Sequence, residues 1–592
     1  MTNHERILET LEAFVRTEIG VEIDRTQLVL DETRKEFEGD FTLVVFPLVK
    51  MFRSAPEAVA NKVGEHLIQS LKEIESFNVI KGFLNLKMTS DYWTRQLAEA
   101  GADSNFFSPR ENGDVVLVEY SSPNTNKPLH LGHLRNNFLG HSVSLMKAFS
   151  GDDVVKTQII NDRGVHICKS MLAWRKFGDG ETPESSGLKG DKLVGKYYVI
   201  FDQHLRSEIS ELEHQGVSNE EAKKAAPLMM EVQEMLQKWE ANDPEIRKLW
   251  SMMNGWVYAG FEHTYDRMQV SFDHLYYESE TYLKGKDIVV KGLADGVFYK
   301  KEDGSVWCDL EAEGLDHKLL IRGDGTTVYM TQDIGTAVLR FEDYPEMTQA
   351  IYTVGDEQDY HFKVLFKILE KLGYSWAPNC RHLSYGMVDL PSGKMKSREG
   401  TVVDADDLMV EVVRAAQESS QDKGRLDSLS ESEQRDLFET LGIGALKFFL
   451  LRVDPKKRMM FDPEESVALN GDTGPFVQYT YARCRAVLRK SGADPIRADL
   501  EGVQLMDKER ALLRGLMSFR AEMNTAAMAM NPSAVANYCL EIAKVYNQFY
   551  HDIPILTADG AERSFRLELT RLTSETIKVG MSLLGIDVPE QM

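Results

Sequence analysis

The stretch that most constrains the fold of this chain is a buried strand, a polar turn and a helix in direct succession. Val115–Val118 is a short apolar run of the kind that forms a buried strand. The turn that follows, Glu119–His133, is mostly polar, and from Leu134 to Phe149 apolar residues recur mainly at helical spacing. Strand, turn and helix in this order form the first half of a βαβ unit, which predicts an α/β domain with a parallel sheet. Ligands of such sheets bind at the carboxyl ends of the strands, where this turn is expected.

The turn carries side chains suited to binding an anion. His130 and His133 lie beside a predicted helix start, where backbone N–H groups favour negative charge. Imidazole rings can donate hydrogen bonds to phosphate oxygens, Lys127 adds a positive charge, and Gly132 lets a ligand lie against the backbone. Two histidines in a loop are, on their own, more often incidental than catalytic. The preceding strand, and a second motif that begins at Lys394, favour the catalytic interpretation.

That second motif is Lys394-Met-Lys-Ser-Arg-Glu-Gly-Thr401. Together with Ser-Ser-Pro-Asn-Thr-Asn-Lys-Pro-Leu-His-Leu-Gly-His at residues 121–133, it resembles the HIGH and KMSKS signatures of class I aminoacyl-tRNA synthetases. The longer form of the first motif resembles arginyl-tRNA synthetases in particular, and the resemblance extends from near the N-terminus to the last residue. It implies an arginine–tRNA ligase, which activates L-arginine with ATP and transfers it to tRNA(Arg), releasing pyrophosphate and AMP. It also implies that tRNA must be bound before arginine is activated.

Composition is consistent with a large globular protein. A chain of 592 residues is too long for one core, so several domains are expected, and 43% hydrophobic with 27% charged residues is an ordinary balance. No apolar run of about 18 residues predicts a membrane span, and the first residues contain no signal core. The five cysteines are scattered, which argues against a disulfide framework and a structural zinc site and favours a reducing cytoplasm. The net charge of −24 argues against a nucleic-acid partner unless basic groups gather on one face.

The patterns divide the chain into four regions: an α+β module over 1–112, a Rossmann-type catalytic domain over 113–403, a helical connector over 404–470 and an all-helical bundle over 471–592. Charged helices at about 169–267 predict an insertion between the two halves of the catalytic sheet. The resemblance implies that the first region contacts the tRNA elbow and that the last region binds the anticodon. From the residues alone, the first region is also consistent with a packing module and the last with a plain helical bundle.

Several strands are predicted around the central unit. Residues 77–87 alternate and predict one strand, as do 272–280. A β-rich stretch with turns at 294–296 and 302–304 is expected next, and 383–388 is expected to be the last strand, after which the chain is helical.

The resemblance assigns the phosphate chemistry to two motifs. His130 and His133 would bind ATP and the developing charge, while Lys394 and Lys396 would meet the β- and γ-phosphates. This chain departs from the family signature, because Ser397 stands where the second lysine of KMSKS is expected. Members with a variant loop are thought to use a lysine just before the histidines, and Lys127 matches that position. One ammonium can replace another because each acts as a point charge.

Specificity for arginine requires hydrogen-bond acceptors, because a guanidinium has five fixed donors and no acceptor. Tyr329 and Asp333 are four residues apart, so they share a helix face and could bracket one guanidinium. Glu278 matches a second family acceptor, with Glu280 as its rival. The resemblance also assigns the ammonium and carboxylate of arginine to Glu119, Ser122, Asn124 and Gln358. It assigns ATP to Gly132, Gly355, Asp356, Met387, Val388 and Ser397.

The implied cofactor is Mg²⁺ carried by ATP, without zinc, and the implied protein is a cytoplasmic monomer. Two alternatives remain open. One is a different class I synthetase or a class I nucleotidylyltransferase. The other is a tRNA-binding paralogue without catalytic activity, which the altered Lys394 motif would fit.

Overall fold

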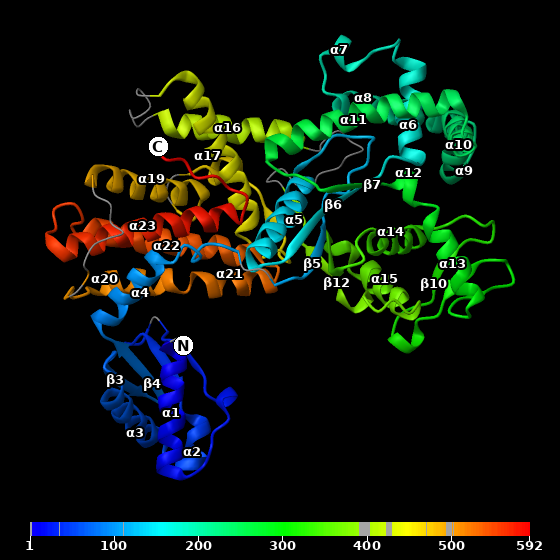
Figure 1. Ribbon diagram of the computed structural model, residues 1–592. Coiled ribbons are helices and arrows are strands. Elements are labelled where there is room, and N and C mark those ends of the chain that lie inside the picture. Colours follow the sequence, from blue (N-terminus) through cyan, green and yellow to red (C-terminus); the bar gives the residue numbers. More distant parts are fainter. Residues whose placement is uncertain are drawn as a thin grey trace.

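The computed structural model describes residues 3–34, 36–109, 112–389, 403–421, 429–468, 471–492, 500 and 502–592. Figure 1 shows a central α/β region, an N-terminal domain that projects from it, and a helical C-terminal region alongside. The predicted fold class is confirmed, since the central sheet is parallel, the N-terminal sheet is antiparallel and the C-terminal region is helical. The Lys394 motif lies outside the described residues.

The N-terminal domain is an antiparallel sheet covered by helices. Its elements are α1 (Asn3–Ile19), β1 (Leu30–Glu32), β2 (Phe41–Val44), α2 (Phe46–Phe52), α3 (Pro56–Ser70), β3 (Ile74–Ile80) and β4 (Phe83–Met88), with sheet order β1-β2-β4-β3. The prediction of one strand over 77–87 was wrong, because β3 and β4 form a hairpin. Lys81 and Gly82 make the turn with φ of 50° and 81°. The alternation of apolar residues continues through the turn and conceals it.

The central sheet has five parallel strands in the order β12-β11-β5-β6-β7. They are β5 (Val115–Glu119), β6 (Asp153–Ile160), β7 (His274–Tyr277), β11 (Met347–Gly355) and β12 (Cys380–Tyr385). The accompanying helices are α5 (Leu131–Ser150), α14 (Tyr329–Asp343) and α15 (Asp359–Lys371). β6 and β7 lie on one side of β5, and β11 and β12 lie on the other. The strand order therefore reverses between β5 and β11, which is where open α/β sheets bind ligands.

Two predictions after β6 need correction. The strand expected over 272–280 ends at Tyr277, and a short helix α12 (Glu278–Thr281) follows. The β-rich stretch begins instead with the helix α13 (Lys284–Ala294) and only then gives an antiparallel sheet of β8 (Tyr299–Lys300), β9 (Val306–Cys308) and β10 (Lys318–Ile321). A Cβ atom on Gly335 of α14 would lie 2.5 Å from the backbone nitrogen of Gly285. These two glycines allow α13 and α14 to pack backbone to backbone, a tertiary effect that the local pattern does not reveal.

The strand expected over 383–388 is divided at Gly386. β12 stays in the main sheet, whereas β13 (Val388–Asp389) pairs with β14 (Met459–Met460) from the C-terminal region. Gly386 donates its N–H to the carbonyl of Pro455 at 2.8 Å, and a Cβ there would lie 2.7 Å from the nitrogen of Arg458. The chain after residue 404 is thus not entirely helical.

Six helices form an insertion between β6 and β7, above the sheet in Figure 1. They are α6 (Val165–Phe177), α7 (Pro183–Ser186), α8 (Gly190–His214), α9 (Asn219–Ala225), α10 (Pro227–Glu240) and α11 (Pro244–Met268). α11 returns the chain to the sheet immediately before β7.

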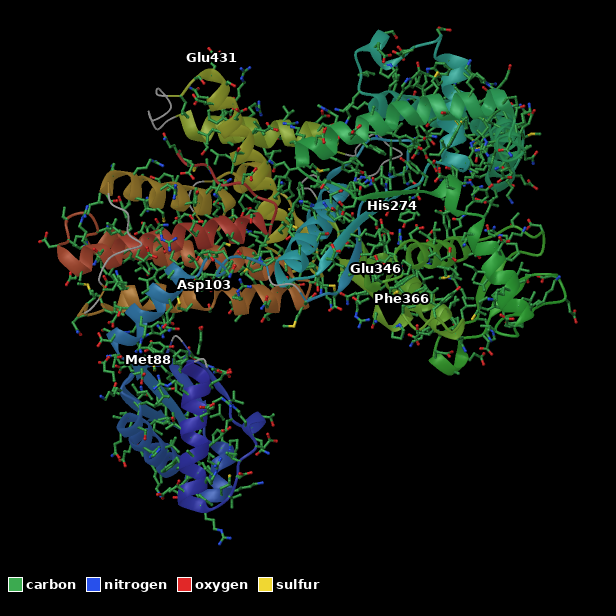
Figure 2. The ribbon with its side chains drawn as sticks, viewed as in Figure 1. Met88, Asp103, His274, Glu346, Phe366 and Glu431 are labelled. Carbon is green, nitrogen blue, oxygen red and sulfur yellow. The ribbon has the colours of Figure 1, made fainter. Side chains whose placement is uncertain are left out.

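The C-terminal helices pack against α5 and against the helix that follows the N-terminal domain. They are α16 (Ala405–Gln421), α17 (Glu431–Leu451), α18 (Pro463–Ser466), α19 (Gly474–Ser491), α20 (Asp507–Met517), α21 (Phe519–Met528), α22 (Pro532–Asp552) and α23 (Gly560–Ser582). The linking helix α4 (Ser90–Ala102) runs between Met88 and Asp103, labelled in Figure 2, and contacts α20 and α23. Arg510 donates to the carbonyl of Met88 at 2.6 Å. In the described part of the chain, no helix is both long and apolar enough to span a membrane.

Candidate functional site

His130 and His133 close the amino end of α5 with reciprocal hydrogen bonds. The backbone N–H of His130 donates to Nδ1 of His133 at 3.1 Å, and the N–H of Gly132 donates to Nδ1 of His130 at 3.2 Å. The ring centroids are 3.9 Å apart. Because each Nδ1 accepts a hydrogen bond from a backbone N–H, each neutral ring carries its own proton on Nε2. The cap therefore leaves two Nε2–H donors available to a ligand.

The environment keeps both rings neutral. Burial, assisted by the charge of Lys127, lowers the pKa of His130 to about 3. Burial also lowers the pKa of His133 well below its ordinary value, with smaller effects from His130 and Lys127. Burial lowers the pKa of Lys127 as well, and this lysine forms no ion pair within the described residues. An ammonium that lacks a carboxylate partner beside two hydrogen-bond donors is an arrangement suited to phosphate oxygens.

A pocket of about 240 Å³ opens beside this cap. Its wall is formed by the turn from Lys127 to His130, by α8 and by Asp404. Gly195 of α8 permits the close approach, since a Cβ there would lie 2.9 Å from Cδ of Pro128. The chain on the C-terminal side of the Lys394 motif is also held here, because Ala405 donates its N–H to the carbonyl of Leu129 at 3.0 Å. On the other side of that motif, β13 contacts α5.

A second group of predicted residues gathers around Glu278. Burial raises the pKa of Glu278 to about 7, Arg163 opposes this effect, and the charges of Asp162 and Asp333 add to it. Glu278 is half-buried at the start of α12, whereas its rival Glu280 is exposed. Glu278 and Asp333 are therefore close enough for their charges to interact.

Asp333 and Tyr329 come from the first turn and a half of α14, as the spacing predicts. The Asp333 carboxylate meets Nε2 of His361, which follows β11, at 2.5 Å. The side chain of Tyr329 is 76% exposed, so its hydroxyl is accessible to a ligand. His361 was not predicted, although its position just after a strand end is a signal that could have suggested it.

Glu119, expected to contact arginine, already has a partner inside the protein. It is 5% exposed and forms an ion pair with Arg340 of α14. The Arg340 guanidinium lies 5.2 Å from the ring centroid of Tyr276 and 5.3 Å from that of Tyr352. Arg340 was missed because a basic residue near the end of a helix usually points to solvent.

The remaining predicted residues lie at the same edge of the sheet. Asn124 is exposed and bridges to Asn161 after β6, while Ser122 is half-buried. A Cβ atom on Gly355 would lie 3.8 Å from Sδ of Met387, so the ends of β11 and β12 are adjacent. Asp356 and Gln358 are exposed after β11, and Val388 is buried in β13. Lys394, Lys396 and Ser397 lie outside the described residues.

Buried polar side chains of α5 connect this helix to the sheet and to the loop before β14, and none of them was predicted. Arg135 is fully buried and donates from Nη2 to the carbonyls of Pro455 and Lys457 at 3.1 and 2.9 Å. Asn136 donates to the carbonyl of Thr353 at 2.7 Å. Polar residues at the buried positions of a helical pattern were the available signal.

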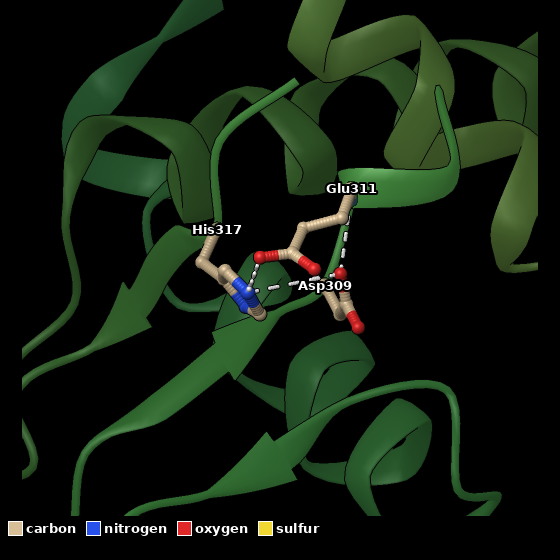
Figure 3. Close-up of side chains that lie close together, drawn as sticks. All are labelled: Asp309, Glu311 and His317. Atoms are coloured by element: carbon tan, nitrogen blue, oxygen red, sulfur yellow. Dashed lines mark hydrogen bonds and ion pairs between the residues drawn. The ribbon is translucent and has the colours of Figure 1, made fainter. Parts of the chain in front are cut away.

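One further cluster of potential metal ligands occurs in the described residues, at the antiparallel sheet of β8, β9 and β10. Figure 3 shows Asp309, Glu311 and His317. All three are exposed, Nε2 of His317 lies 3.1 Å from the Glu311 carboxylate, and its Nδ1 lies 2.7 Å from the Tyr299 hydroxyl. A surface histidine–carboxylate pair accounts for their spacing.

Comparison with known proteins identifies the family. Residues 100–462 match the model of the class I (R) tRNA synthetase catalytic domain, residues 3–88 the arginyl-tRNA synthetase N-terminal domain, and residues 477–592 the DALR anticodon-binding domain. The chain belongs to the arginyl-tRNA synthetases. It is thus a class I aminoacyl-tRNA synthetase, an arginine–tRNA ligase whose catalytic domain binds ATP, as the sequence predicted.

Similarity to other arginyl-tRNA synthetases extends over the full chain. The arginine–tRNA ligase of Bacteroides fragilis is 55% identical, with 97% of each chain covered. That of Flavobacterium psychrophilum is 52% identical, with 99% of each chain covered. The solved structure of Thermus thermophilus arginyl-tRNA synthetase shares the fold with a TM-score of 0.77 over 100% of both chains, at 24% identity.

Proposed function

We propose that arginine and ATP meet between the His130–His133 cap and the Glu278–Asp333 pair. The observation that carries this proposal is the division of charge at one sheet edge. Two Nε2–H donors and Lys127 lie at or just before the start of α5, and the two interacting carboxylates lie in the first turns of α12 and α14. The first group suits a triphosphate and the second suits a guanidinium.

In this arrangement, Asp333 and Glu278 accept hydrogen bonds from the guanidinium, and the Tyr329 hydroxyl completes the set. The mutual repulsion of the two carboxylates supports this role, because a bound cation relieves it. Glu278 is preferred to Glu280, since Glu278 is half-buried and its charge interacts with that of Asp333, whereas Glu280 is exposed. The ammonium and carboxylate of arginine are assigned to Ser122, Asn124 and Gln358, with Glu119 acting through its ion pair with Arg340 rather than as a free carboxylate.

ATP occupies the opposite side of the site. The Nε2–H groups of His130 and His133 donate to phosphate oxygens, and Lys127 supplies the positive charge that Ser397 cannot. Lys394 and Lys396 act on the outer phosphates, while Gly132, Gly355, Asp356, Met387 and Val388 hold the nucleoside. The arginine carboxylate attacks the α-phosphorus and pyrophosphate leaves, so the protein contributes positioning and charge stabilisation more than covalent chemistry.

Mg²⁺ is assigned to the nucleotide phosphates. The cap offers N–H donors and an ammonium, which bind phosphate oxygens and do not coordinate a cation. The fit is therefore with an ion carried by ATP, which neutralises phosphate charge. No zinc is assigned to the site.

The regions outside the catalytic domain are assigned to tRNA(Arg). A hollow of about 590 Å³ in the C-terminal bundle is lined by Tyr479, Arg483 and Tyr550. The Arg483 guanidinium lies 4.9 Å from each tyrosine ring centroid. Aromatic rings and an arginine suit unstacked anticodon bases. Residues 471–592 would bind the anticodon, 1–112 the tRNA elbow, and 404–470 would connect the two ends, in a cytoplasmic monomer.

The direct test is aminoacylation of purified tRNA(Arg) with each of the twenty amino acids. We expect transfer of arginine alone, and loss of transfer in the His133→Ala variant. As a matched control, His317→Ala removes an imidazole from the surface cluster of Figure 3 and should leave the rate unchanged. Transfer of another amino acid, or no transfer by the wild type, would overturn the proposal.

A further inference from the structure

Asp162 is a buried carboxylate that the proposed reaction does not use. It follows β6 in the loop beside Asn161, is 1% exposed, and forms no ion pair within the described residues. A buried charge without a cationic partner is costly, so its hydrogen bonds must compensate for the lost water. The partners in these hydrogen bonds show which segments Asp162 holds in place.

The Asp162 carboxylate accepts three hydrogen bonds from two elements. Oδ1 accepts the backbone N–H of Ser279 at 2.9 Å, and Oδ2 accepts the Ser279 hydroxyl at 2.7 Å and the Tyr258 hydroxyl at 3.0 Å. The carbonyl of Asp162 also accepts from the Trp250 indole at 2.6 Å and from Asn254 at 3.3 Å. The loop after β6 is thereby joined to α11 of the insertion and to α12.

Ser279 is the immediate neighbour of Glu278. Both the main chain and the side chain of Ser279 are held by the same carboxylate, so the backbone that carries Glu278 cannot rotate freely. The same loop is tied to the turn that carries Asn124, since Thr125 donates its N–H to the carbonyl of Asn161 at 3.1 Å. Asp162 therefore lies at the junction of two groups of residues assigned to arginine.

We propose that Asp162 is a positioning residue for arginine recognition, which fixes the Glu278 carboxylate through Ser279 and adds negative charge behind it. This inference depends on the role proposed above for Glu278. It assigns to the insertion helix α11, through Tyr258, a part in holding the amino-acid site. It also explains why a carboxylate is buried where an amide could make similar contacts, because an amide would not attract a cation.

The charges around Glu278 come from every element packed against it. Asp162 and Arg163 belong to the loop after β6, and Asp333 belongs to α14. Nearby titratable hydroxyls are Tyr258 of α11 and Tyr277 of β7, and their pKa values are raised by burial and by Asp162. Of these groups, Asp162 and Asp333 hold the pKa of Glu278 up, and Arg163 holds it down.

The test compares Asp162→Asn with Glu278→Gln. The asparagine is nearly the same shape, and the Ser279 and Tyr258 hydroxyls can turn to accept from its amide, so the loop should remain folded. Asp266→Asn, an exposed change on α11, is the matched control for the loss of one charge. The readouts are KM for arginine, KM for ATP, and the pH profile of kcat/KM for arginine.

We expect Asp162→Asn to raise KM for arginine about tenfold, because the negative charge behind Glu278 is lost and charge-assisted hydrogen bonds are replaced by weaker neutral ones, with KM for ATP and the control unchanged. The acid limb of the pH profile should also move to lower pH, because the charge that raises the pKa of Glu278 is gone. A lower Tm with an unmoved pH profile would indicate a structural role only and overturn the inference. So would an unchanged KM for arginine in Asp162→Asn when Glu278→Gln raises it.

If the role proposed for Glu278 in arginine binding were wrong, the result would differ, because Glu278→Gln would then leave KM for arginine unchanged. Should Asp162→Asn fail to fold, Ser279→Ala and Tyr258→Phe each remove one bond while Asp162 stays charged. About a threefold rise in KM for arginine is expected for Ser279→Ala. No rise in either variant would overturn the positioning role.

Discussion

The imidazole rings of His130 and His133 use their Nδ1 atoms to cap the helix on which both stand, at 3.2 and 3.1 Å from backbone nitrogens. The capping role is therefore combined, in the same side chains, with the catalytic role proposed for them. The cap determines which nitrogen carries the proton, and it aims the other nitrogen away from the helix. The two roles can be separated by substitution, because only one of them requires Nε2.

His130→Asn should separate stability from activity. Asparagine is a preferred N-cap residue, so its side-chain oxygen can replace Nδ1, but no donor replaces Nε2–H. We expect arginine-dependent ATP–pyrophosphate exchange to fall about a hundredfold with an unchanged Tm. His130→Ala should lose the same activity and also about 1 kcal/mol of stability. Equal Tm losses in the two variants would show that the cap contributes nothing.

The same histidine predicts a dependence of stability on acid. Burial lowers the pKa of His130 to about 3 from an ordinary value of 6.5. A depressed pKa contributes stability that is fully present above 6.5 and is lost as the pH falls toward 3. Between pH 6.5 and 5 the unfolding free energy should fall by up to ~1.4 kcal/mol per pH unit from this residue. Thermal unfolding of wild type and His130→Asn across this range should show a shallower decline for the variant; parallel curves would refute the assignment.

Arginine affinity should depend on pH through Glu278. Its pKa of about 7 means that part of the population is protonated at neutral pH, and only the carboxylate attracts a guanidinium. KM for arginine should therefore decrease as the pH rises from 6 to 8. The dependence should disappear in Glu278→Gln and persist in Glu280→Gln. If Glu280→Gln abolished the dependence instead, the second acceptor would be Glu280.

The buried pair of Glu119 and Arg340 should behave as a structural unit. Their side chains are 7% and 1% exposed, so Arg340→Met leaves an unpaired charge in the core. We expect the free energy of unfolding to fall by about 3–5 kcal/mol. The measurement is the unfolding transition of the catalytic domain in denaturant. The double variant Glu119→Gln/Arg340→Met should recover much of this loss. No recovery would mean that packing of Arg340 against Tyr276 and Tyr352, rather than its charge, is what matters.

Sequence reasoning succeeded where local pattern and tertiary structure agree. The apolar run at Val115 and the helical spacing after Leu134 became β5 and α5, and the spacing of Tyr329 and Asp333 placed both on α14. It failed where a distant contact decides the local structure. Gly386 ends β12 because the chain around Pro455 packs against it, and nothing within a few residues of Gly386 reveals that partner.

The candidate site also has one part that local sequence indicates and another that depends on distant contacts. The two motifs are local stretches of sequence, so their residues could be proposed for the site from the sequence alone. Arg340, His361 and Asp162 come from other elements. They contact Glu119, Asp333 and Ser279 respectively, and only the fold brings these pairs together. Residue type did not predict their place in the site, since each is a charged or titratable residue of a kind that usually lies at the surface.

Whether Lys127 replaces the lysine that the Lys394 motif lacks is the central claim about this chain. Its ammonium is partly buried, its pKa is lowered by burial, and no carboxylate among the described residues pairs with it. A cation kept in this state beside the helix cap is available for the phosphates of ATP.

The most direct measurement is arginine-dependent ATP–pyrophosphate exchange, with and without tRNA(Arg), for wild type and Lys127→Ala, with Lys196→Ala as a control. Lys196 lines the same pocket but is paired with Glu181 at 2.7 Å. We expect exchange only with tRNA present, a loss of roughly a hundredfold (on the order of 3 kcal/mol) in Lys127→Ala, and little change in the control. Full activity in Lys127→Ala would contradict the account and return the phosphate role to Lys394 and Lys396.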